Sequence, residues 1–227
     1  MPGGSRREEI GQRVLSANDR IAAENRVRFK AAGLYVLNLI GSPGSGKTSI
    51  LEATVRRLGL RMGVIQGDVQ TSLDAARVRA AGAESVQIET GGACHLDARM
   101  VARAMRELPL EALDLVFIEN VGNLVCPTGY DLGEDEKVAV LSVPEGDEKP
   151  VKYPALFVRA GVVLINKTDL VPHTNFSMER VKGDLDKLHA GVTVLAMSCR
   201  SGEGLQAWCD YLRRRAGAGR PGPGVGE

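Results

Sequence analysis

The chain has 227 residues, which is enough for one domain of ordinary size and for two only if both are small. Its 29 basic and 28 acidic residues nearly cancel to a net charge of +1, and 44% of its residues are hydrophobic. This balance excludes the strongly basic surface of a nucleic-acid binder and the composition of a disordered chain. We therefore expect a globular protein that does not bind nucleic acid.

The sequence also lacks the signals of a membrane or secreted protein. No apolar run reaches the roughly 18–20 residues that a membrane-spanning helix requires. The start of the chain, MPGGSRREEIGQ, has no apolar stretch of the kind found in a secretory signal. We expect a cytoplasmic protein without membrane contact, in which the four cysteines are thiols rather than disulfides.

Composition divides the chain into four predicted segments. The first, 1–7, is small and polar, and the last, 216–227, is rich in glycine and proline, so we expect both to be disordered. Residues 8–33 are predicted to form an N-terminal helix, because apolar side chains recur there at helical spacing and Gly33 ends the pattern. The remaining segment, 34–215, is predicted to be one domain.

Apolar stretches alternate with amphipathic ones along this domain. The stretches predicted as strands are 34–40, 61–67, 85–89, 114–119, 137–143, 161–166 and 192–197. The stretches predicted as helices are 47–58, 71–82, 96–108, 151–159, 177–189 and 204–215. Continuously apolar strands are buried on both faces, as in a parallel sheet covered by helices. The sequence therefore predicts an α/β fold, with a mostly parallel sheet flanked by helices and an N-terminal helical extension.

A glycine-rich loop follows the first predicted strand and precedes a predicted helix. Its residues, Gly41-Ser42-Pro43-Gly44-Ser45-Gly46-Lys47-Thr48, match the phosphate-loop pattern G-x-x-x-x-G-K-[ST]. Glycines let backbone N–H groups turn inward on a β-phosphate, and a helix N-terminus favours negative charge. We expect Lys47 to contact the β- and γ-phosphates and Thr48 to bind Mg²⁺ through its hydroxyl, with Ser49 in the same site.

Two later strands end on residues suited to a metal ion and a γ-phosphate. Asp68 follows the second predicted strand and is expected to meet Mg²⁺ directly or through water, although a helix cap is the alternative reading. Glu119-Asn120-Val121-Gly122 resembles the E-x-x-G switch of GTPases, in which Gly122 lets a backbone N–H approach the γ-phosphate. Asn123 stands where many small GTPases place a water-orienting glutamine, so we expect slow intrinsic hydrolysis. The residues expected to act in catalysis are Lys47, Asp68, Glu119 and Gly122.

An N-K-x-D box, Asn166-Lys167-Thr168-Asp169, ends the sixth predicted strand. In the GTPases that this box resembles, the aspartate accepts hydrogen bonds from guanine N1–H and the exocyclic amine. Adenine lacks both donors and would leave a buried carboxylate unpaired. The segment 198–200, after the next strand, resembles the base-contacting loop of GTPases. We therefore expect GTP rather than ATP, and the residues expected to contact the base are Asn166, Lys167, Asp169, Ser198, Cys199 and Arg200.

Two cysteines and a histidine follow neighbouring predicted strands. Cys94 and His95 lie in the run GGACHLD, and Cys126 lies a few residues beyond the Glu119 switch. Loops after parallel strands meet at the edge of the sheet where nucleotide binds, so these side chains can converge near the γ-phosphate. Two thiolates and an imidazole suit Zn²⁺ or Ni²⁺, with a fourth ligand from water or a second subunit. The spacing alone fits equally well a buried apolar cysteine and a helix-capping histidine.

Other residues of these types have simpler interpretations. His173 and His189 have no cysteine nearby and are expected at the surface, and Cys209 is expected in the core. Lys149 and Lys152 lie in a charged segment that we expect to be a solvated loop, with contact to a nucleotide across a dimer as the alternative.

Five runs of sequence together resemble the HypB family of GTPases, which assist nickel insertion into [NiFe] hydrogenase. They are NLIGSPGSGKTSILE, GDVQTSLDAARV, TGGACHLDARMV, ENVGNLVCP and INKTDL, and the similarity extends from about Val14 to Leu212. The resemblance implies a GTP-favoured homodimer with Cys94, His95 and Cys126 binding Zn²⁺ or Ni²⁺ at the subunit interface. It also implies a zinc-containing HypA-type accessory protein and the hydrogenase large subunit as partners. The sequence has neither the N-terminal cysteine cluster nor the histidine-rich stretch of some members, so nickel storage is not expected.

Two other functions remain open from the sequence. One is a GTPase that serves another metalloenzyme, such as urease or a cobalamin enzyme, against which only the Cys94-His95 motif argues. The other is a phosphate-loop kinase with a structural zinc, which would need an acceptor pocket and would tend to lack the N-K-x-D box.

Overall fold

Seven parallel strands form a single sheet in the computed structural model, which describes residues 4–68 and 73–218. The strand order across the sheet is β3-β2-β4-β1-β5-β6-β7. The strands are β1 Tyr35–Gly41, β2 Met62–Asp68, β3 Glu84–Glu89, β4 Leu115–Glu119, β5 Glu136–Ser142, β6 Val162–Asn166 and β7 Thr193–Ala196. The prediction of a parallel sheet flanked by helices is confirmed.

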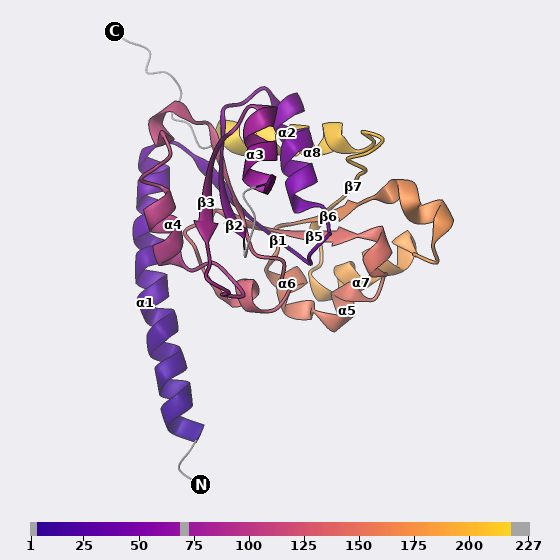
Figure 1. Ribbon diagram of the computed structural model, residues 1–227. Helices are drawn as coiled ribbons and strands as arrows, with labels where there is room; N and C mark the ends of the chain where they lie inside the picture. The colour runs from indigo at the N-terminus through magenta and orange to yellow at the C-terminus, as the bar shows by residue number, and fades with distance from the viewer. Residues whose placement is uncertain (1–3, 69–72, 219–227) are drawn as a thin grey trace.

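Helices cover both faces of this sheet (Figure 1). Side chains of α2 Lys47–Leu58, α3 Leu73–Ala81 and α8 Leu205–Ala218 pack on one face. Those of α1 Gly4–Ala31 and α4 Ala98–Ala104 pack on the other, together with α6 Pro154–Arg159 and α7 Met178–Leu188. The remaining short helices are α5 Lys149–Lys152, η1 Leu110–Ala112, η2 Cys126–Gly129, η3 Val143–Glu145 and η4 Thr168–His173.

The apolar strands explain this layering, because successive side chains of a strand point to opposite faces. In β1, Leu37 and Leu39 pack in the core under α2 and α8, whereas Val36 packs in the core under α1 and α4. All three are fully buried. Trp208, on α8, is also fully buried, and its indole N–H donates to the Thr54 hydroxyl at 3.0 Å. A strand buried on both faces thus joins two cores into one domain.

Several element boundaries differ from the sequence prediction for physical reasons. Helix α4 begins at Ala98 rather than at the predicted 96, because the Asp97 side chain caps its N-terminus by accepting from the Met100 N–H at 2.7 Å, and it ends at Ala104 rather than 108. The predicted helix 151–159 is divided into α5 and α6, with Pro154 as the first residue of α6. Helix α1 begins at Gly4, inside the predicted head, and α8 continues to Ala218, inside the predicted tail. The rest of both terminal segments, 1–3 and 219–227, lies outside the described residues.

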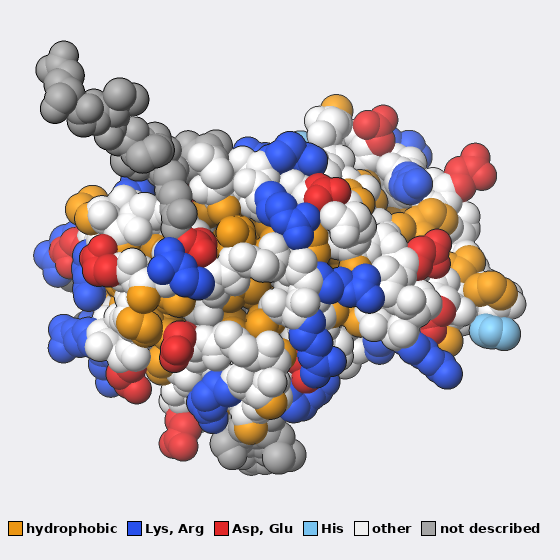
Figure 2. Space-filling view, turned by 90° about the horizontal axis from the view of Figure 1, so that it is seen from above, with side chains coloured by type: hydrophobic (Ala, Val, Ile, Leu, Met, Phe, Trp, Pro, Cys, Tyr) orange, Lys and Arg blue, Asp and Glu red, His pale blue; other side chains and the backbone are white. Residues whose placement is uncertain are grey.

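The surface carries both charge signs. Basic and acidic side chains are interspersed on the face seen from above, over α2, α3 and α8 (Figure 2). The N-terminal part of α1 extends away from the body of the domain (Figure 1). Among the described residues, no helix is both long enough and apolar enough to cross a membrane.

Candidate nucleotide and metal site

The glycine-rich loop lies between β1 and α2, at the carboxyl edge of the sheet. Gly46 directly precedes α2 with a φ of 94°, and a Cβ there would collide with the Asn166 side chain, so only glycine fits. The Lys47 ammonium donates to the carbonyls of Gly41 and Ser42, each at 3.1 Å. Burial lowers the pKa of Lys47, while the nearby Glu119 carboxylate acts in the opposite direction. The loop thus holds the buried Lys47 ammonium against its own carbonyls, in a position where it can bind an anion.

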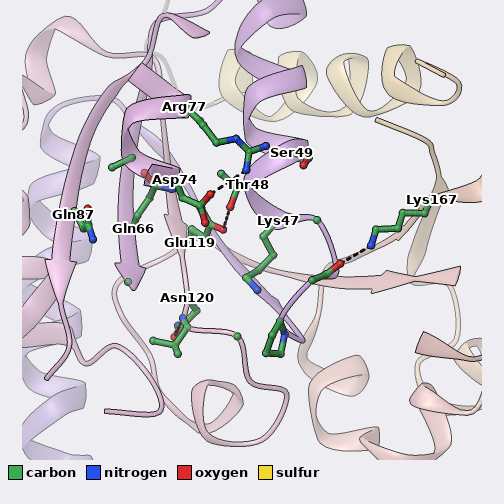
Figure 3. A pocket seen from close by; sticks show the side chains of 17 residues that line it. Lys47, Thr48, Ser49, Gln66, Asp74, Arg77, Gln87, Glu119, Asn120 and Lys167 are labelled. Carbon is green, nitrogen blue, oxygen red and sulfur yellow. Dashed lines mark hydrogen bonds and ion pairs between the residues drawn. The ribbon is translucent and has the colours of Figure 1, made fainter. Parts of the chain in front are cut away.

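Glu119, the last residue of β4, links this loop to the centre of the sheet. Its carboxylate accepts from the Thr48 hydroxyl at 2.7 Å and from the Gln66 amide at 2.8 Å. Burial raises the pKa of Glu119 above its usual value, although both hydrogen bonds lower it. A cavity of about 500 Å³ opens above these residues, and Figure 3 shows Thr48, Glu119 and Gln66 gathered at its floor. The oxygen atoms of Thr48 and Glu119 are the ligand type that Mg²⁺ prefers.

Asp68 and Gly122 flank this position. Asp68 ends β2, where it is opposite Glu89 of β3, and its side chain lies outside the described residues. Gly122 follows β4 and packs against the glycine-rich loop, since a Cβ there would lie 2.8 Å from the Pro43 Cγ. Glycine at 122 therefore lets this backbone approach the glycine-rich loop closely. The approach of its N–H to a γ-phosphate stays a prediction.

The N-K-x-D box packs directly on the glycine-rich loop. The Asn166 amide donates to the Ser45 carbonyl at 3.1 Å, and the Lys167 ammonium donates to the Gly44 carbonyl at 2.7 Å. The Asp169 carboxylate accepts from the Ser198 hydroxyl at 2.6 Å. These contacts bring together two segments that are far apart in the sequence.

A second cavity, of about 410 Å³, lies beside the N-K-x-D box. The predicted base-contacting residues that line it are Asn166, Lys167, Asp169, Ser198, Cys199 and Arg200. Burial raises the pKa of the Cys199 thiol to about 11, so this cysteine is a neutral, packed group at physiological pH. The cavity is lined by the Asp169 carboxylate and, in contact with it, by Ser198 of the segment after β7.

The structure also brings together Cys94, His95 and Cys126. Their ligand atoms all lie within 4.8 Å of one another, with the Cys94 Sγ 3.4 Å from the His95 Nδ1. A hydrogen bond with Cys126 raises the pKa of the Cys94 thiol. Burial lowers the pKa of His95, which favours the neutral imidazole that binds metals. Two sulfur atoms and one imidazole fit Zn²⁺ or Ni²⁺ and leave one position for a further ligand.

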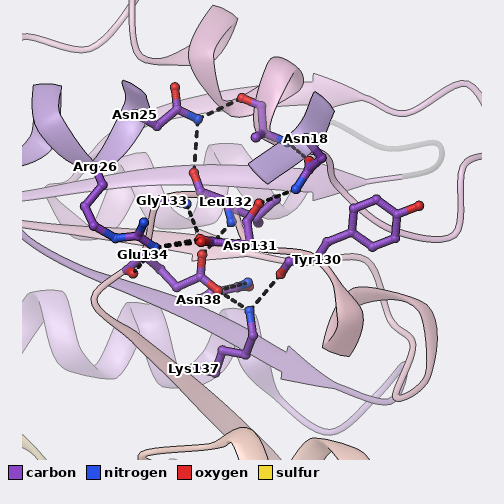
Figure 4. A network of polar contacts seen from close by, with 11 residues as sticks. Asn18, Asn25, Arg26, Asn38, Tyr130, Asp131, Leu132, Gly133, Glu134 and Lys137 are labelled. Carbon is purple, nitrogen blue, oxygen red and sulfur yellow. Dashed lines mark hydrogen bonds and ion pairs between the residues drawn. The ribbon is translucent and has the colours of Figure 1, made fainter. Parts of the chain in front are cut away.

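Helix α1 holds segments that lie close in sequence to these three residues, and Figure 4 shows its Asn25 side chain bonded to Leu132. The buried Asn25 amide donates to the Ala98 carbonyl at 2.8 Å and to the Leu132 carbonyl at 3.0 Å. The first carbonyl follows His95 in sequence and the second follows Cys126, so one side chain joins both loops to the helix. The His95 ring also packs on the Tyr130 ring, with 3.9 Å between centroids.

Several contacts at this edge were not indicated by sequence patterns. The Lys149 ammonium lies 3.4 Å from the Ser42 hydroxyl of the same chain and 3.6 Å from the Glu145 carboxylate, so it is not simply a solvated loop residue. Asp74 and Arg77 of α3 line the larger cavity. No motif predicts these positions, because each depends on how separate segments pack together.

The other predicted positions are as follows. Cys209 is fully buried in the core, as expected. His173 is exposed at the end of η4. His189 is half-buried, and its Nδ1 atom is buried without a hydrogen-bond partner among the described residues.

The fold and the loop geometry define a class of protein. A parallel sheet with a G-x-x-x-x-G-K-T loop between its first strand and the next helix is the architecture of phosphate-loop nucleotide-binding proteins. Residues 35–196 match the family described as "CobW/HypB/UreG, nucleotide-binding domain". The chain belongs to this family of phosphate-loop GTPase domains and, within it, to the HypB hydrogenase maturation factors.

Two relatives, one of them also as a crystal structure, illustrate the similarity. The hydrogenase maturation factor HypB of Azotobacter chroococcum mcd 1 is 52% identical over 218 residues, covering 94% of this chain and 71% of that protein. The hydrogenase/urease maturation factor HypB of Helicobacter pylori is 44% identical, covering 90% of this chain and 86% of that protein. The crystal structure of HypB from Helicobacter pylori in complex with nickel has a TM-score of 0.86 and 43% identity, covering 89% of this chain and 96% of the other.

Proposed function

We propose that this protein is a GTP-hydrolysing nickel metallochaperone that assists the maturation of [NiFe] hydrogenase. The observation that carries the proposal is the position of two thiols and an imidazole, within 4.8 Å of one another, on loops next to the phosphate loop. A nucleotide site alone fits many GTPases, whereas this cluster adds a site for a soft metal ion at the same edge of the sheet. The nickel complex of the Helicobacter pylori relative supports the same assignment.

In this proposal the nucleotide is GTP with Mg²⁺. Lys47 and the glycine-rich loop hold the phosphates, and Thr48 and Asp68 would hold Mg²⁺. Glu119 accepts from the Thr48 hydroxyl at 2.7 Å and keeps it oriented. The Gly122 backbone, which packs on Pro43, would approach the γ-phosphate. Asp169 selects guanine over adenine. We infer slow intrinsic hydrolysis, because Asn123 replaces the glutamine that orients water in many small GTPases.

The metal is held by Cys94, His95 and Cys126. The site has three protein ligands, so a second copy of the chain or water supplies the fourth, and a GTP-favoured homodimer would place two such sites at its interface. Exposure of the Cys94 side chain leaves the ion accessible to a partner. We propose a HypA-type accessory protein and the hydrogenase large subunit as those partners, in the reducing cytoplasm that keeps the four cysteines free.

Metal-binding stoichiometry tests this function. Cys94→Ala and Cys126→Ala each remove a soft ligand. We expect Ni²⁺ and Zn²⁺ affinity to fall by at least about 10- to 100-fold, because mutating a residue that only supports a metal ligand typically has an effect of that size. His95→Ala has a matched control in His173→Ala, whose imidazole is exposed at the end of η4. Wild-type affinity in both cysteine variants would remove the metal site from the proposal.

Nucleotide competition tests the proposed GTP specificity independently of metal binding. GTP should displace a fluorescent guanine nucleotide far better than ATP does, because only guanine pairs with both oxygens of the Asp169 carboxylate. Equal competition would favour the phosphate-loop kinase instead.

The client enzyme is the part most open to an alternative. The Helicobacter pylori relative is named as a hydrogenase/urease maturation factor, so nickel delivery toward urease is a second candidate. Reconstituting apo-hydrogenase and apo-urease separately with the nickel-loaded protein and GTP distinguishes the two, by the enzyme that gains activity.

A further inference from the structure

One short segment contacts both the nucleotide site and the metal cluster. It runs from Glu119, the last residue of β4, to Asn123. Glu119 accepts from Thr48, and Gly122 packs on Pro43, so the segment is fixed to the glycine-rich loop at two positions. The two asparagines between and after these residues point the other way, to the loop that carries Cys94 and His95.

Asn120 holds the carboxyl side of that loop. It is 1% exposed, and its Oδ1 accepts from the Val121 N–H and from the Leu96 N–H, each at 3.1 Å. Leu96 directly follows His95 in the chain. A single buried oxygen thus fixes the switch backbone and the backbone of the metal loop together. The Leu96 N–H would lose this acceptor if the segment moved alone, which is costly in a buried position.

Asn123 holds the amino side of the same loop. Its Nδ2 donates to the Cys94 carbonyl at 3.1 Å, and its Oδ1 accepts from the Val125 N–H at 2.9 Å. Val125 directly precedes Cys126. One carboxamide therefore joins the backbone of one cysteine to the residue beside the other cysteine. The sequence singled out Asn123 only because it stands where many small GTPases have a water-orienting glutamine. In the structure, its side chain bonds the backbone on both sides of the metal cluster.

A buried chain of hydrogen bonds continues behind Asn120. Its Nδ2 donates to the Asn38 Oδ1 at 3.2 Å, and the Asn38 amide donates to the Glu134 Oε1 at 3.2 Å. The other oxygen of Glu134 accepts from the Leu132 N–H at 2.7 Å, in the stretch between Cys126 and β5 (Figure 4). The loop with Cys94 and His95 is therefore connected to the end of β4 through a side-chain amide, and the stretch after Cys126 through amides and the Glu134 carboxylate.

We propose that Asn120 and Asn123 couple the nucleotide site to the Cys94–His95–Cys126 cluster. A change at Glu119 or Gly122 with the nucleotide state moves the segment, and the two amides transmit the movement to the backbone on both sides of the metal ligands. Both are positioning residues, since their side chains bond backbone groups beside the metal ligands and Asn38, although Asn120 also lines the larger cavity. The inference rests on the proposed function, because it assigns a regulation to that metal site. Couplings between two ligand sites typically change affinity by about 5- to 150-fold.

A nickel titration in two nucleotide states tests the coupling. The full-length protein is saturated with Mg²⁺ and either GDP or a non-hydrolysable GTP analogue, and Ni²⁺ binding is followed by its thiolate charge-transfer absorption. We expect wild-type affinity to differ between the two states by at least about fivefold. In Asn123→Ala the ion should still bind, with the difference reduced to less than about twofold. Asn175→Ala is the matched control, an exposed asparagine between η4 and α7, and it should keep the wild-type difference.

Two further variants separate coupling from folding. Asn123→Asp keeps an acceptor for the Val125 N–H and loses the donor to the Cys94 carbonyl, and Asn120→Asp keeps the acceptor for the Leu96 N–H and loses the donor to Asn38. Both should weaken the nucleotide dependence of nickel affinity. Asn123 does not line the larger cavity, so Asn123→Asp should leave guanine-nucleotide affinity within about twofold. By linkage, nickel must change the ratio of GDP to GTP-analogue affinity by the same factor, and that factor should shrink in the same variants.

The outcomes distinguish this inference from the proposed function. Equal nickel affinity in both nucleotide states of the wild type, or an undiminished difference in both Asn123→Ala and Asn120→Asp, would overturn the coupling and leave the metal site standing. Hydrogen exchange of the Leu96 amide gives a readout that needs no metal. If nucleotide state changes that exchange but Cys94→Ala and Cys126→Ala both bind nickel like the wild type, the metallochaperone function fails and the connection between the loops survives.

Discussion

Two regions at the same edge of the sheet are built differently. The nucleotide region uses contiguous motifs at strand ends, and Lys47, Thr48 and Asn166 are all less than 9% exposed. The metal cluster lies on loops, with Cys94 exposed and with His95 and Cys126 half-buried. Its position depends on asparagines from two other segments, α1 and the end of β4. The first region is suited to tight retention of a ligand, and the second to an ion that must enter and leave.

The largest expected effect separates the two regions at the guanine base. In Asp169→Asn the carboxamide keeps an acceptor for the Ser198 hydroxyl but replaces one carboxylate oxygen by a donor. We expect GDP affinity to fall by about 100-fold, since hydrogen bonds to charged groups contribute about 1.5–3 kcal/mol each. Xanthine nucleotides should bind better than they do to the wild type, because xanthine presents an acceptor where guanine presents its amine. Fluorescence competition measures both.

The metal cluster should be unaffected by that change. Nickel stoichiometry and the charge-transfer spectrum of Asp169→Asn should equal those of the wild type when no nucleotide is present. A loss of nickel binding in this variant would mean that the two regions fold as one unit and that the comparison above does not hold.

A smaller effect is expected at the support of the metal loops. Asn25→Ala leaves the carbonyls of Ala98 and Leu132 without their side-chain donor, in a position where Asn25 is 1% exposed. We expect the free energy of unfolding to fall by about 2 kcal/mol, the scale of unsatisfied buried groups. Nickel affinity should fall as well, with little change in guanine-nucleotide affinity. Chemical denaturation and the nickel titration provide the two measurements.

The control lies on the same helix. Glu24→Ala alters an exposed residue beside Asn25, and its effect on stability should stay within about 0.5 kcal/mol. If Asn25→Ala weakens nucleotide binding as much as nickel binding, α1 supports the whole edge rather than the metal loops.

The difference between the regions also explains what the sequence could predict. Most strand boundaries were predicted to within a residue, because continuous apolar runs and the phosphate-loop motif are local signals. The convergence of Cys94, His95 and Cys126 was predictable from parallel topology, since loops after parallel strands share an edge. The contacts of Asn25 were not predictable, because its partners are 73 and 107 residues away and their acceptors are backbone carbonyls. A side chain that binds main-chain atoms leaves no residue pattern at its partner.

The smallest expected effect concerns the electrostatics of the nucleotide region without bound nucleotide or Mg²⁺. Burial raises the pKa of Glu119 above the usual 4.5, so the folded chain binds this proton more readily than the unfolded chain does. The stabilising effect of the proton is present at low pH and is lost as pH rises through the folded-state pKa. Glu119→Gln is neutral at every pH and avoids that loss. Without nucleotide or Mg²⁺, the variant should therefore be more stable than the wild type at pH 7.5, with an advantage that shrinks toward pH 4.5.

Thermal unfolding at the two pH values measures this difference, and each kcal/mol relieved corresponds to about 2–4 °C for a chain of this size. Glu111→Gln, at an exposed position in η1, controls for the loss of one negative charge. If Glu119→Gln melts below the wild type at both pH values, the hydrogen bonds from Thr48 and Gln66 outweigh the cost of burying the carboxylate. If it melts higher only at pH 7.5, burial of the Glu119 carboxylate destabilises the nucleotide region, and a bound Mg²⁺ would offset that cost. The Cys94–His95–Cys126 cluster includes no buried carboxylate, so it carries no such cost.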